Sequence, residues 1–547
     1  MLDSSDAKLH DETPNERIEM SKRLNPSATE YRLPTGTRIR DLTNRLRAQS
    51  DVDLSNLETE RRTYLDTFDW RLFGAGIRAE IAETDAGLHL VISELSSGEL
   101  WRCIPVSAPP RFARELPEGP VRRRLGEIIE MRALMPLATI SVRVRTASVQ
   151  NRDAKTIARV QIERPMLEPA TNGSRRRLGT TVRLSPVRGY DKAAERLSER
   201  LEKDLRLKRA DEPLAGRALA AAGHEPGDYN SNLAVVLDPA MPADAAFRRL
   251  LARLLEVVLA NEPGMRADLD SEYLHDFRVS VRRARSLVSQ ARGVIDESIR
   301  EQLADELRWL GGITSEQRDL DVHLLEFHFG ANSQMAELER YLQARQMRVH
   351  TRLVQDLDSA RHAALLKLWG HIAAHEPAKA ELESLLDARR AIHEVSRERI
   401  WKAYRSLSRH GRAVDDASPD EELHDLRKRG KKLRYLLESF RSIYDSDTIA
   451  GLISELKRLQ NVLGEFQDTV VHAESLRAVA AEMMDDDAVS ASTLMDMGSA
   501  ADRLIERRGA ARALFASRFA GFDAKKNRQH FRKLFAPAEV RPKNATS

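Results

Sequence analysis

The first part of the chain alternates between apolar and polar positions, whereas the second part repeats its apolar positions at helical spacing. Segments such as TISVRVR (139–145) and IARVQIER (157–164) point every second side chain to the same face, as β-strands do. Residues 243–522 instead carry apolar side chains at i, i+3, i+4 and i+7, the spacing of helices with one buried face. The pattern therefore predicts a β-rich domain followed by an all-α domain.

The strands of the first domain carry charge on one side. In residues 139–145, Val142 and Val144 point one way, while Arg143 and Arg145 point the other. Two interpretations remain open. The guanidinium groups line the charged interior of a barrel or curved sheet, or they cover a solvated outer face.

The distribution of Pro and Gly along the chain indicates where the domains meet. Pro and Gly are frequent in residues 210–242, which is typical of a linker. We expect the following division: a disordered N-terminal segment (1–27), the β-rich domain (28–209), the linker (210–242), the helical domain (243–522, with repeat copies around 243–372 and 388–522) and a loose basic C-terminal tail (523–547).

The helical part contains a repeat. LHDFRVSVRRAR begins at Leu274 and LHDLRKRGKKLR at Leu423, 149 positions later. A second pair, LRWLGGITSEQRDLDVH (307–323) and LKRLQNVLGEFQDTVVH (456–472), has the same offset. Two separate matches with one offset indicate duplication of a whole bundle. We therefore expect two related helical bundles packed side by side.

Each copy carries a stripe of cations. At roughly 100° per residue, the first copy places His275, Arg278, Arg282 and Arg285 within a sector of roughly 80°, and the second copy does the same with His424, Arg427, Lys431 and Arg434. Each stripe lies beside an apolar stripe that seats the helix in its bundle. Like charges one turn apart repel, so an anion should compensate them, although a solvated basic face is the alternative. The candidate anion-binding residues are His275, Arg278, Arg282, Arg283, Arg285, His424, Arg427, Lys428, Lys431, Lys432 and Arg434.

Overall charge and cysteine content narrow the function classes. Lys and Arg total 88 against 84 Asp and Glu, so an anion site must come from local clustering. Cys103 is the single cysteine, which excludes an internal disulfide and cysteine-rich metal sites. The sequence shows neither a signal peptide nor an apolar stretch near the ~18 residues that a spanning helix needs. We expect a cytoplasmic protein without a membrane partner.

The two motifs, together with RDLDV (318–322), resemble the CHAD family, the conserved histidine α-helical domain. This resemblance implies two four-helix bundles related by a pseudo-twofold axis, with a basic central surface that binds inorganic polyphosphate. It assigns that role to the candidate residues above. The second copy has Gln467 and Val470 where the first has Arg318 and Asp321.

The upstream domain resembles the CYTH family, the triphosphate tunnel fold, at YLDTFDWRLFGAGIRAE (64–80). The resemblance implies an N-terminal α+β domain with an antiparallel, barrel-like sheet, and hydrolysis that depends on Mg²⁺ or Mn²⁺ if the domain is active. The family's Glu-x-Glu-x-Lys strand is reduced to Glu30, Tyr31 and Arg32, and Glu80 replaces an expected arginine. The resemblance marks Arg78, Arg143, Arg145 and Arg159 as remnants of phosphate ligands. We expect a degenerate domain with no catalytic residues and no metal ligands.

The leading hypothesis is a cytoplasmic polyphosphate-binding protein, associated with polyphosphate granules, whose CYTH-like domain is an inactive companion. The first alternative is a metal-dependent inorganic triphosphatase. The second is a nucleic-acid-binding protein, which is disfavoured because few aromatic residues interleave with the basic stripes.

Overall fold

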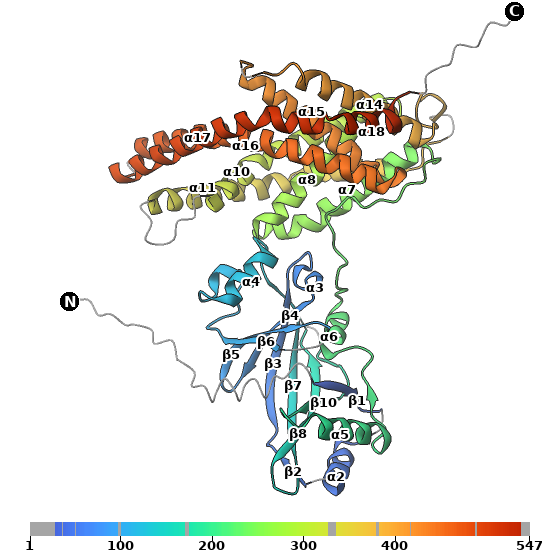
Figure 1. The fold of residues 1–547 in the computed structure, drawn as a ribbon, viewed down its shortest axis with the longest axis vertical. Coiled ribbons are helices and arrows are strands. Elements are labelled where there is room, and N and C mark those ends of the chain that lie inside the picture. Colours follow the sequence, from blue (N-terminus) through green and yellow to red (C-terminus); the bar gives the residue numbers. More distant parts are fainter. Residues whose placement is uncertain are drawn as a thin grey trace, which may run out of the picture. The chain divides into compact units, whose positions relative to one another are not determined.

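The computed structural model describes residues 28–34, 37–49, 51–96, 100–169, 174–326, 335–378, 382–415, 417–486 and 489–537 (Figure 1). It divides the chain into two compact units, Met1–Asn230 and Ser231–Ser547. The segment 1–27, which we expected to be disordered, lies outside the described residues.

The first unit is built on an antiparallel sheet, which confirms the predicted α+β class. The described strands form one eleven-stranded sheet in the order β11-β1-β10-β8-β7-β3-β4-β5-β6, with β2 paired to β7 and β9 to β8. The strands are β1 (Thr29–Arg32), β2 (Asp51–Leu54), β3 (Glu58–Asp66), β4 (Ile77–Thr84), β5 (Gly87–Glu94), β6 (Leu100–Pro105), β7 (Met135–Gln150), β8 (Thr156–Leu167), β9 (Arg176–Arg177), β10 (Thr181–Pro186) and β11 (Lys208–Arg209).

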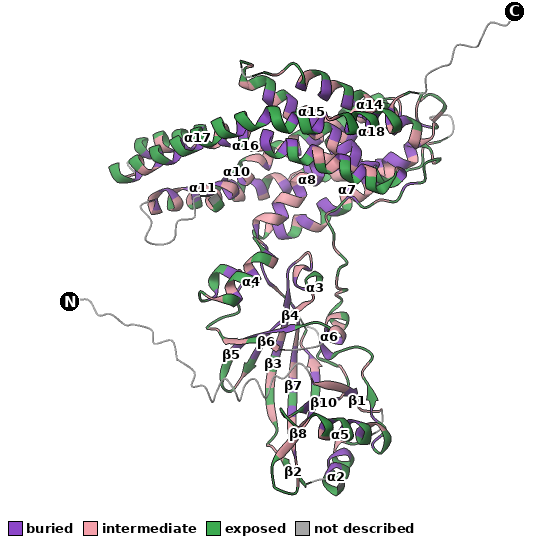
Figure 2. Cartoon of the chain, viewed as in Figure 1, coloured by how far each residue is buried: buried purple, intermediate pink, exposed green. Residues whose placement is uncertain are grey.

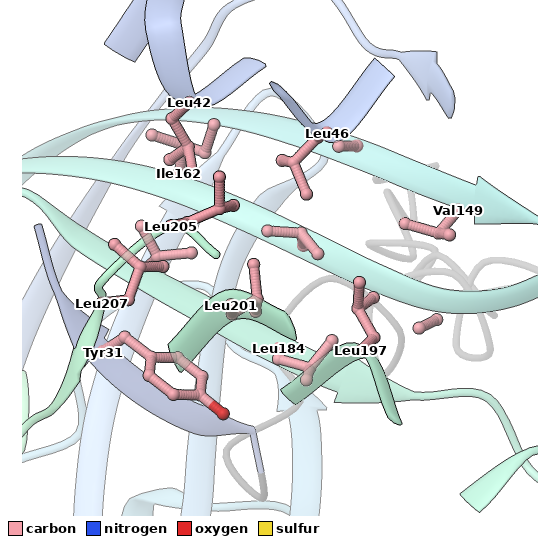
Figure 3. Packing of buried hydrophobic residues seen from close by; sticks show 14 of the residues in the cluster. Tyr31, Leu42, Leu46, Val149, Ile162, Leu184, Leu197, Leu201, Leu205 and Leu207 are labelled. Atoms are coloured by element: carbon pink, nitrogen blue, oxygen red, sulfur yellow. The ribbon is translucent and has the colours of Figure 1, made fainter. Parts of the chain in front are cut away.

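Helices cover both faces of this sheet. The helices of the unit are α2 (Ile39–Gln49), α3 (Arg71–Gly74), α4 (Pro120–Ile129), α5 (Asp191–Lys203) and α6 (Leu214–Ala222). Leucines of α2 and α5 pack on alternate residues of β7, β8 and β10, among them Val149, Ile162 and Leu184 (Figure 3). We call this side the α5 face. Val142 and Val144 of β7 point to the opposite side, where they pack against α6, and we call that side the α6 face.

Helix α6 lies inside the predicted linker, so the linker assignment is wrong over residues 214–222. Leu214, Ala215 and Ala218 are buried against β7. Pro213 stands at the N-cap, and Gly223 ends the helix with φ 89°. Pro and Gly therefore mark the ends of a short helix here, a placement that both residues favour.

The second unit is all-α, as the sequence predicts, and its helices bury one side and expose the other (Figure 2). The first half contains α7 (Ala243–Arg266), α8 (Ser271–Val288), α9 (Glu297–Ile313), α10 (Ser315–Glu326), α11 (Ala336–Leu357) and α12 (Ala360–Ala374). The second contains α14 (Ile392–Gly411), α15 (Asp420–Ser439), α16 (Ser446–Asp485), α17 (Ala491–Phe522) and α18 (Lys525–Phe535). The pairs α7 and α14, α8 and α15, and α9 and α16 each begin 149 residues apart, the same offset as the sequence motifs.

The expected loose tail is wrong over residues 525–535, which form α18. Phe531 and Phe535 of this helix are fully buried. The ring of Phe531 stacks on Tyr404 of α14, with a centroid distance of 3.9 Å. Aromatic residues one turn apart thus hold the basic helix on the bundle, while residues 538–547 lie outside the described part.

Among the described helices, none combines the length and the apolar character needed to cross a membrane.

Candidate functional site

The two helices that carry the basic motifs contact each other in the helical unit. Helix α8 lies against α15, and a pocket of about 670 Å³ opens beside them. His275 of α8 lines this pocket together with Arg427, Lys431 and Arg434 of α15. We call it the cleft. The structure therefore brings cations of the two sequence copies to one site.

Neighbouring cations lower the pKa of Lys431 in the cleft. The pKa of Lys431 falls to about 8, because the side chain is largely buried and because Arg427 and Arg282 lie close to it. Arg282 belongs to α8 and Lys431 to α15, so the repulsion acts between the two stripes. Repulsion of this kind between fixed cations is what a bound anion would relieve.

Two carboxylates moderate the positive charge. Asp468 of α16 accepts a hydrogen bond from Arg427, with an N–O distance of 2.9 Å, but its side chain is 56% exposed. Glu465 lies 3.6 Å from Arg507 of α17, and both are about half exposed. Exposed ion pairs contribute roughly 0–1 kcal/mol, so a polyanion can replace these partners at small cost.

Arg278, another predicted anion-binding residue, contacts the first half of the helical unit. Its guanidinium donates to the Gly311 carbonyl at 3.0 Å and to the Thr314 hydroxyl at 2.7 Å. Burial, followed by the proximity of Arg282, lowers its pKa to about 10. These contacts hold the junction between α9 and α10, where the first copy breaks and α16 of the second copy continues. Arg278 therefore ties α8 to this junction through its Nη1 atom.

Other predicted residues point away from the cleft or are already paired. Arg283 pairs with Glu438 at 3.1 Å, and Lys428 pairs with Asp425 at 3.2 Å. The charged neighbours that lower the pKa of Lys432, after burial, are Lys402, Arg399 and Arg429 on the side of α14. Helical periodicity placed these residues near the stripe, but the packing of α14 and the position of Glu438 turn them elsewhere. His424 and Arg285 are the remaining two: Gln467 contacts the Nδ1 atom of His424 at 2.7 Å, and Arg285 is exposed on α8.

Several residues that line the cleft were not among the predicted site residues. Gln460, Asn461 and His472 of α16 and Arg507 of α17 also line the pocket. The ring of His472 lies 5.0 Å from that of His323, its match in the first copy. The second sequence repeat contained this signal, because it aligned the two histidines at the common offset.

The sheet unit holds its own charge cluster on the α6 face. Arg62 of β3 donates to Glu163 of β8 at 2.7 Å and also to Glu60, and Arg183 of β10 donates to Glu163 at 3.3 Å. Glu163 is fully buried. Although burial raises the pKa of Glu163, Arg62 and Arg183 outweigh it and hold the pKa below its usual value. We call Glu60, Arg62, Glu163 and Arg183 the ion ladder, because each of the two arginines pairs with a carboxylate.

Glu30, the single acidic residue that remains of the expected metal-binding motif, also has partners within the protein. Its carboxylate accepts from the Leu214 backbone amide at the start of α6 at 2.9 Å. Arg183 approaches the same carboxylate at 3.8 Å. Glu80 is buried on the same face, opposite Tyr64.

The four predicted phosphate-ligand remnants separate. Arg78 and Arg159 share the α6 face with the ion ladder, because they lie an even number of residues from Glu80 and Glu163. Arg143 and Arg145 point to the α5 face, since Arg145 stands opposite Ile162. Arg143 and Arg145 therefore do not share a face with the ion ladder, which separates them from the other two remnants. Alternation shows which residues share a face, but the register decides which face is enclosed.

This set of side chains does not suit a divalent cation. Mg²⁺ and Mn²⁺ need several oxygen ligands arranged around one point. In the ion ladder the Arg62 guanidinium reaches both Glu60 and Glu163, so a fixed cation already occupies the position between the two carboxylates.

Part of the helical unit is similar to a known protein family. Residues 249–477 match the family model of the CHAD domain. Two proteins of Mycobacterium tuberculosis, both named as uncharacterized, are 28% identical over 292 residues, which are 50% of this chain and 55% of each relative. The chain thus spans about half the length of these curated relatives.

Two solved structures are similar. The CHAD domain from the plant Ricinus communis has a TM-score of 0.43 and 26% identity, covering 57% of this chain and 98% of that one. A putative adenylyl cyclase from Hippeastrum, described as having a dominant triphosphatase activity, has a TM-score of 0.26 and 12% identity, covering 37% and 99%. Within the helical unit, residues 249–477 thus match the model of the CHAD domain, and they follow a unit built on an antiparallel sheet.

Proposed function

We propose that the helical unit binds inorganic polyphosphate in the cleft between α8 and α15. The observation that carries this proposal is the pocket that His275 of α8 lines together with Arg427, Lys431 and Arg434 of α15, basic side chains from both sequence copies. Arg presents planar donors to phosphate oxygens, and Lys a compact charge. These donors and charges are sufficient to bind a phosphate chain, because binding without reaction requires neither a nucleophile nor a base.

We infer that the sheet unit is a companion domain that does not hydrolyse triphosphate. The ion ladder supports this, because Arg62 pairs with Glu163 at 2.7 Å, so each already has an oppositely charged partner within the protein. Helix α6 supports it further, since it packs on the same face and its first amide binds Glu30. The protein then needs no cofactor, acts in the cytoplasm and has polyphosphate, including polyphosphate granules, as its partner.

Titration of the full chain with tripolyphosphate tests the proposal. We expect saturable binding that weakens steeply with salt, because cations released from the phosphate chain contribute to the affinity. Competition between long-chain polyphosphate and RNA at equal phosphate concentration separates polyphosphate binding from nucleic-acid binding. Preference for RNA would replace the proposal by the second alternative.

A phosphate-release assay with tripolyphosphate and Mg²⁺ or Mn²⁺ tests the companion role. We expect no multiple turnovers. Turnover that disappears in Glu30→Ala would instead establish the triphosphatase alternative.

A further inference from the structure

A second group of cations lies on the other side of α15, where this helix faces α14. Lys402 of α14 and Lys432 of α15 are exposed, and Arg429 of α15 is half-buried. Among the described residues, none of the three forms an ion pair with a carboxylate. Burial, together with Lys402, Arg399 and Arg429, lowers the pKa of Lys432. We call Lys402, Arg429 and Lys432 the outer cluster.

The surrounding groups leave this charge uncompensated. Arg399 is neutralised by Asp387 at 2.7 Å, so it adds little net charge. Arg429 donates to the Ser406 hydroxyl at 2.7 Å, which is a neutral partner. Its Nε atom is buried without a hydrogen-bond partner. The outer cluster therefore keeps its positive charge among the described residues.

The first sequence copy has no equivalent of the outer cluster. The positions 149 residues earlier are Arg253, Ser280 and Arg283. Arg253 pairs with Glu256 at 3.0 Å, and Arg283 pairs with Glu438 at 3.1 Å. The matching surface is therefore neutralised in the first copy and left positive in the second.

We propose that the outer cluster is a second phosphate-binding site for long linear polyphosphate, whose chain also occupies the cleft. This inference rests on the proposed function of the cleft. Lys431 in the cleft and Lys432 in the outer cluster are neighbours on α15, with side chains about 100° apart around the helix axis. A helix with its side chains is only about 10 Å thick, so one flexible chain can pass from one site to the other. A short chain fills the cleft alone, whereas a long chain binds both sites.

Binding of the full-length chain to tripolyphosphate and to long-chain polyphosphate tests this inference. The outer variant is Lys402→Gln/Arg429→Gln/Lys432→Gln. We expect it to bind the long chain about tenfold more weakly, with a salt slope smaller by about 2, as for three lost contacts to a single-stranded polyanion. Its affinity for tripolyphosphate should stay within about twofold of the unmodified chain, because the cleft is intact.

The matched control replaces three exposed lysines on other helices, Lys192, Lys367 and Lys525, with Gln. It makes the same change in net charge, and circular dichroism checks that both variants keep their helix content. Equal long-chain affinity of the outer variant and the control would overturn the second site while leaving the cleft proposal intact. Failure of the unmodified chain to bind either phosphate would instead overturn both. A loss of tripolyphosphate binding by the folded outer variant would overturn the separation of the two sites.

Discussion

The α6 face of the sheet and the cleft of the helical unit both concentrate cations, but they balance charge in opposite ways. In the sheet, Arg62 and Arg183 each reach the buried carboxylate of Glu163. In the cleft, Arg427, Lys431 and Arg434 line one pocket, Arg282 helps to lower the pKa of Lys431, and the carboxylates nearby are about half exposed. The comparison teaches that the number of arginines on a surface says little about ligand binding. The position of the nearest carboxylate decides whether a cation remains available.

The largest effect should come from removing the central acid of the ion ladder. Glu163→Gln leaves Arg62 and Arg183 buried with one carboxylate fewer, and breaking a buried pair in this way typically costs about 3–5 kcal/mol. We expect a loss of this size in the free energy of unfolding of the sheet unit, measured by urea denaturation. Because the folded-state pKa of Glu163 is lowered, its stabilising contribution is present above the unfolded-state pKa and is lost as pH falls through the folded-state value.

Glu168→Gln provides the control for this measurement. Glu168 pairs with Arg61 at 2.8 Å, and the Arg61 side chain is 51% exposed. Exposed pairs contribute roughly 0–1 kcal/mol, so this variant should lose little stability. Similar losses in the two variants would show that the ion ladder contributes no more than a surface pair.

In the cleft, removal of charged side chains should weaken ligand binding without lowering the free energy of unfolding. Arg282→Gln/Lys431→Gln removes two phosphate contacts, and hydrogen bonds to charged groups contribute about 1.5–3 kcal/mol each. We expect the affinity for tripolyphosphate to fall by about 100-fold. The free energy of unfolding should stay the same or rise, since the two cations no longer repel each other. Calorimetric titration and thermal unfolding measure the two effects.

The three-lysine control described above, with changes at Lys192, Lys367 and Lys525, separates the local effect from net charge. It should keep nearly full affinity at moderate salt, because its positions are exposed on other helices. If the cleft variant binds as well as this control does, the cleft is not the binding site.

The sequence predicts those features that follow from local periodicity. The 3.6-residue helical period groups Arg427, Lys431 and Arg434 on one side of a helix, and all three line the cleft. The common offset of the motifs likewise predicts helices that begin 149 residues apart, such as α8 and α15.

Features that depend on tertiary packing could not be predicted in this way. Arg283 lies within the same motif, but its partner Glu438 comes from the other sequence copy, 155 residues away. Arg278 binds a carbonyl at the end of another helix, which no local pattern encodes. In the sheet, Arg145 follows the predicted alternation, but only the pairing with β8 shows that it shares a face with Ile162.

The pH dependence of binding gives a smaller, more specific test. Burial and the nearby Arg427 and Arg282 lower the pKa of Lys431 to about 8, so this ammonium loses its proton between about pH 7 and 9 in the free protein. We expect tripolyphosphate affinity to fall several-fold over that range. Lys431→Arg should remove this step, because Arg stays charged.

Loss of the Lys431 proton should weaken binding but stabilise the folded protein. The folded-state pKa of Lys431 lies below the ordinary value near 10.5, so the charged form costs the native state free energy at neutral pH. That cost is relieved as pH rises from about 8 toward 10.5. An affinity that rises between pH 7 and 9, or an equal fall in Lys431→Arg, would exclude Lys431 as the titrating group.

The smallest effect is expected at Lys428, next to the cleft residue Arg427 on the same helix. The Lys428 side chain is 63% exposed and pairs with Asp425 one turn earlier, whereas the Arg427 side chain is 19% exposed and lines the cleft. Lys428→Gln should therefore change tripolyphosphate affinity by less than about twofold, since it loses only an exposed ion pair. Arg427→Gln, which makes the same change in charge one residue earlier, should weaken binding about tenfold through the loss of one charge-assisted contact. Both residues belong to the basic motif, but only Arg427 lies on the helix side that also carries Lys431 and Arg434. Equal losses in the two variants would mean that net charge on α15 governs binding, whereas unequal losses would show that the side of the helix matters.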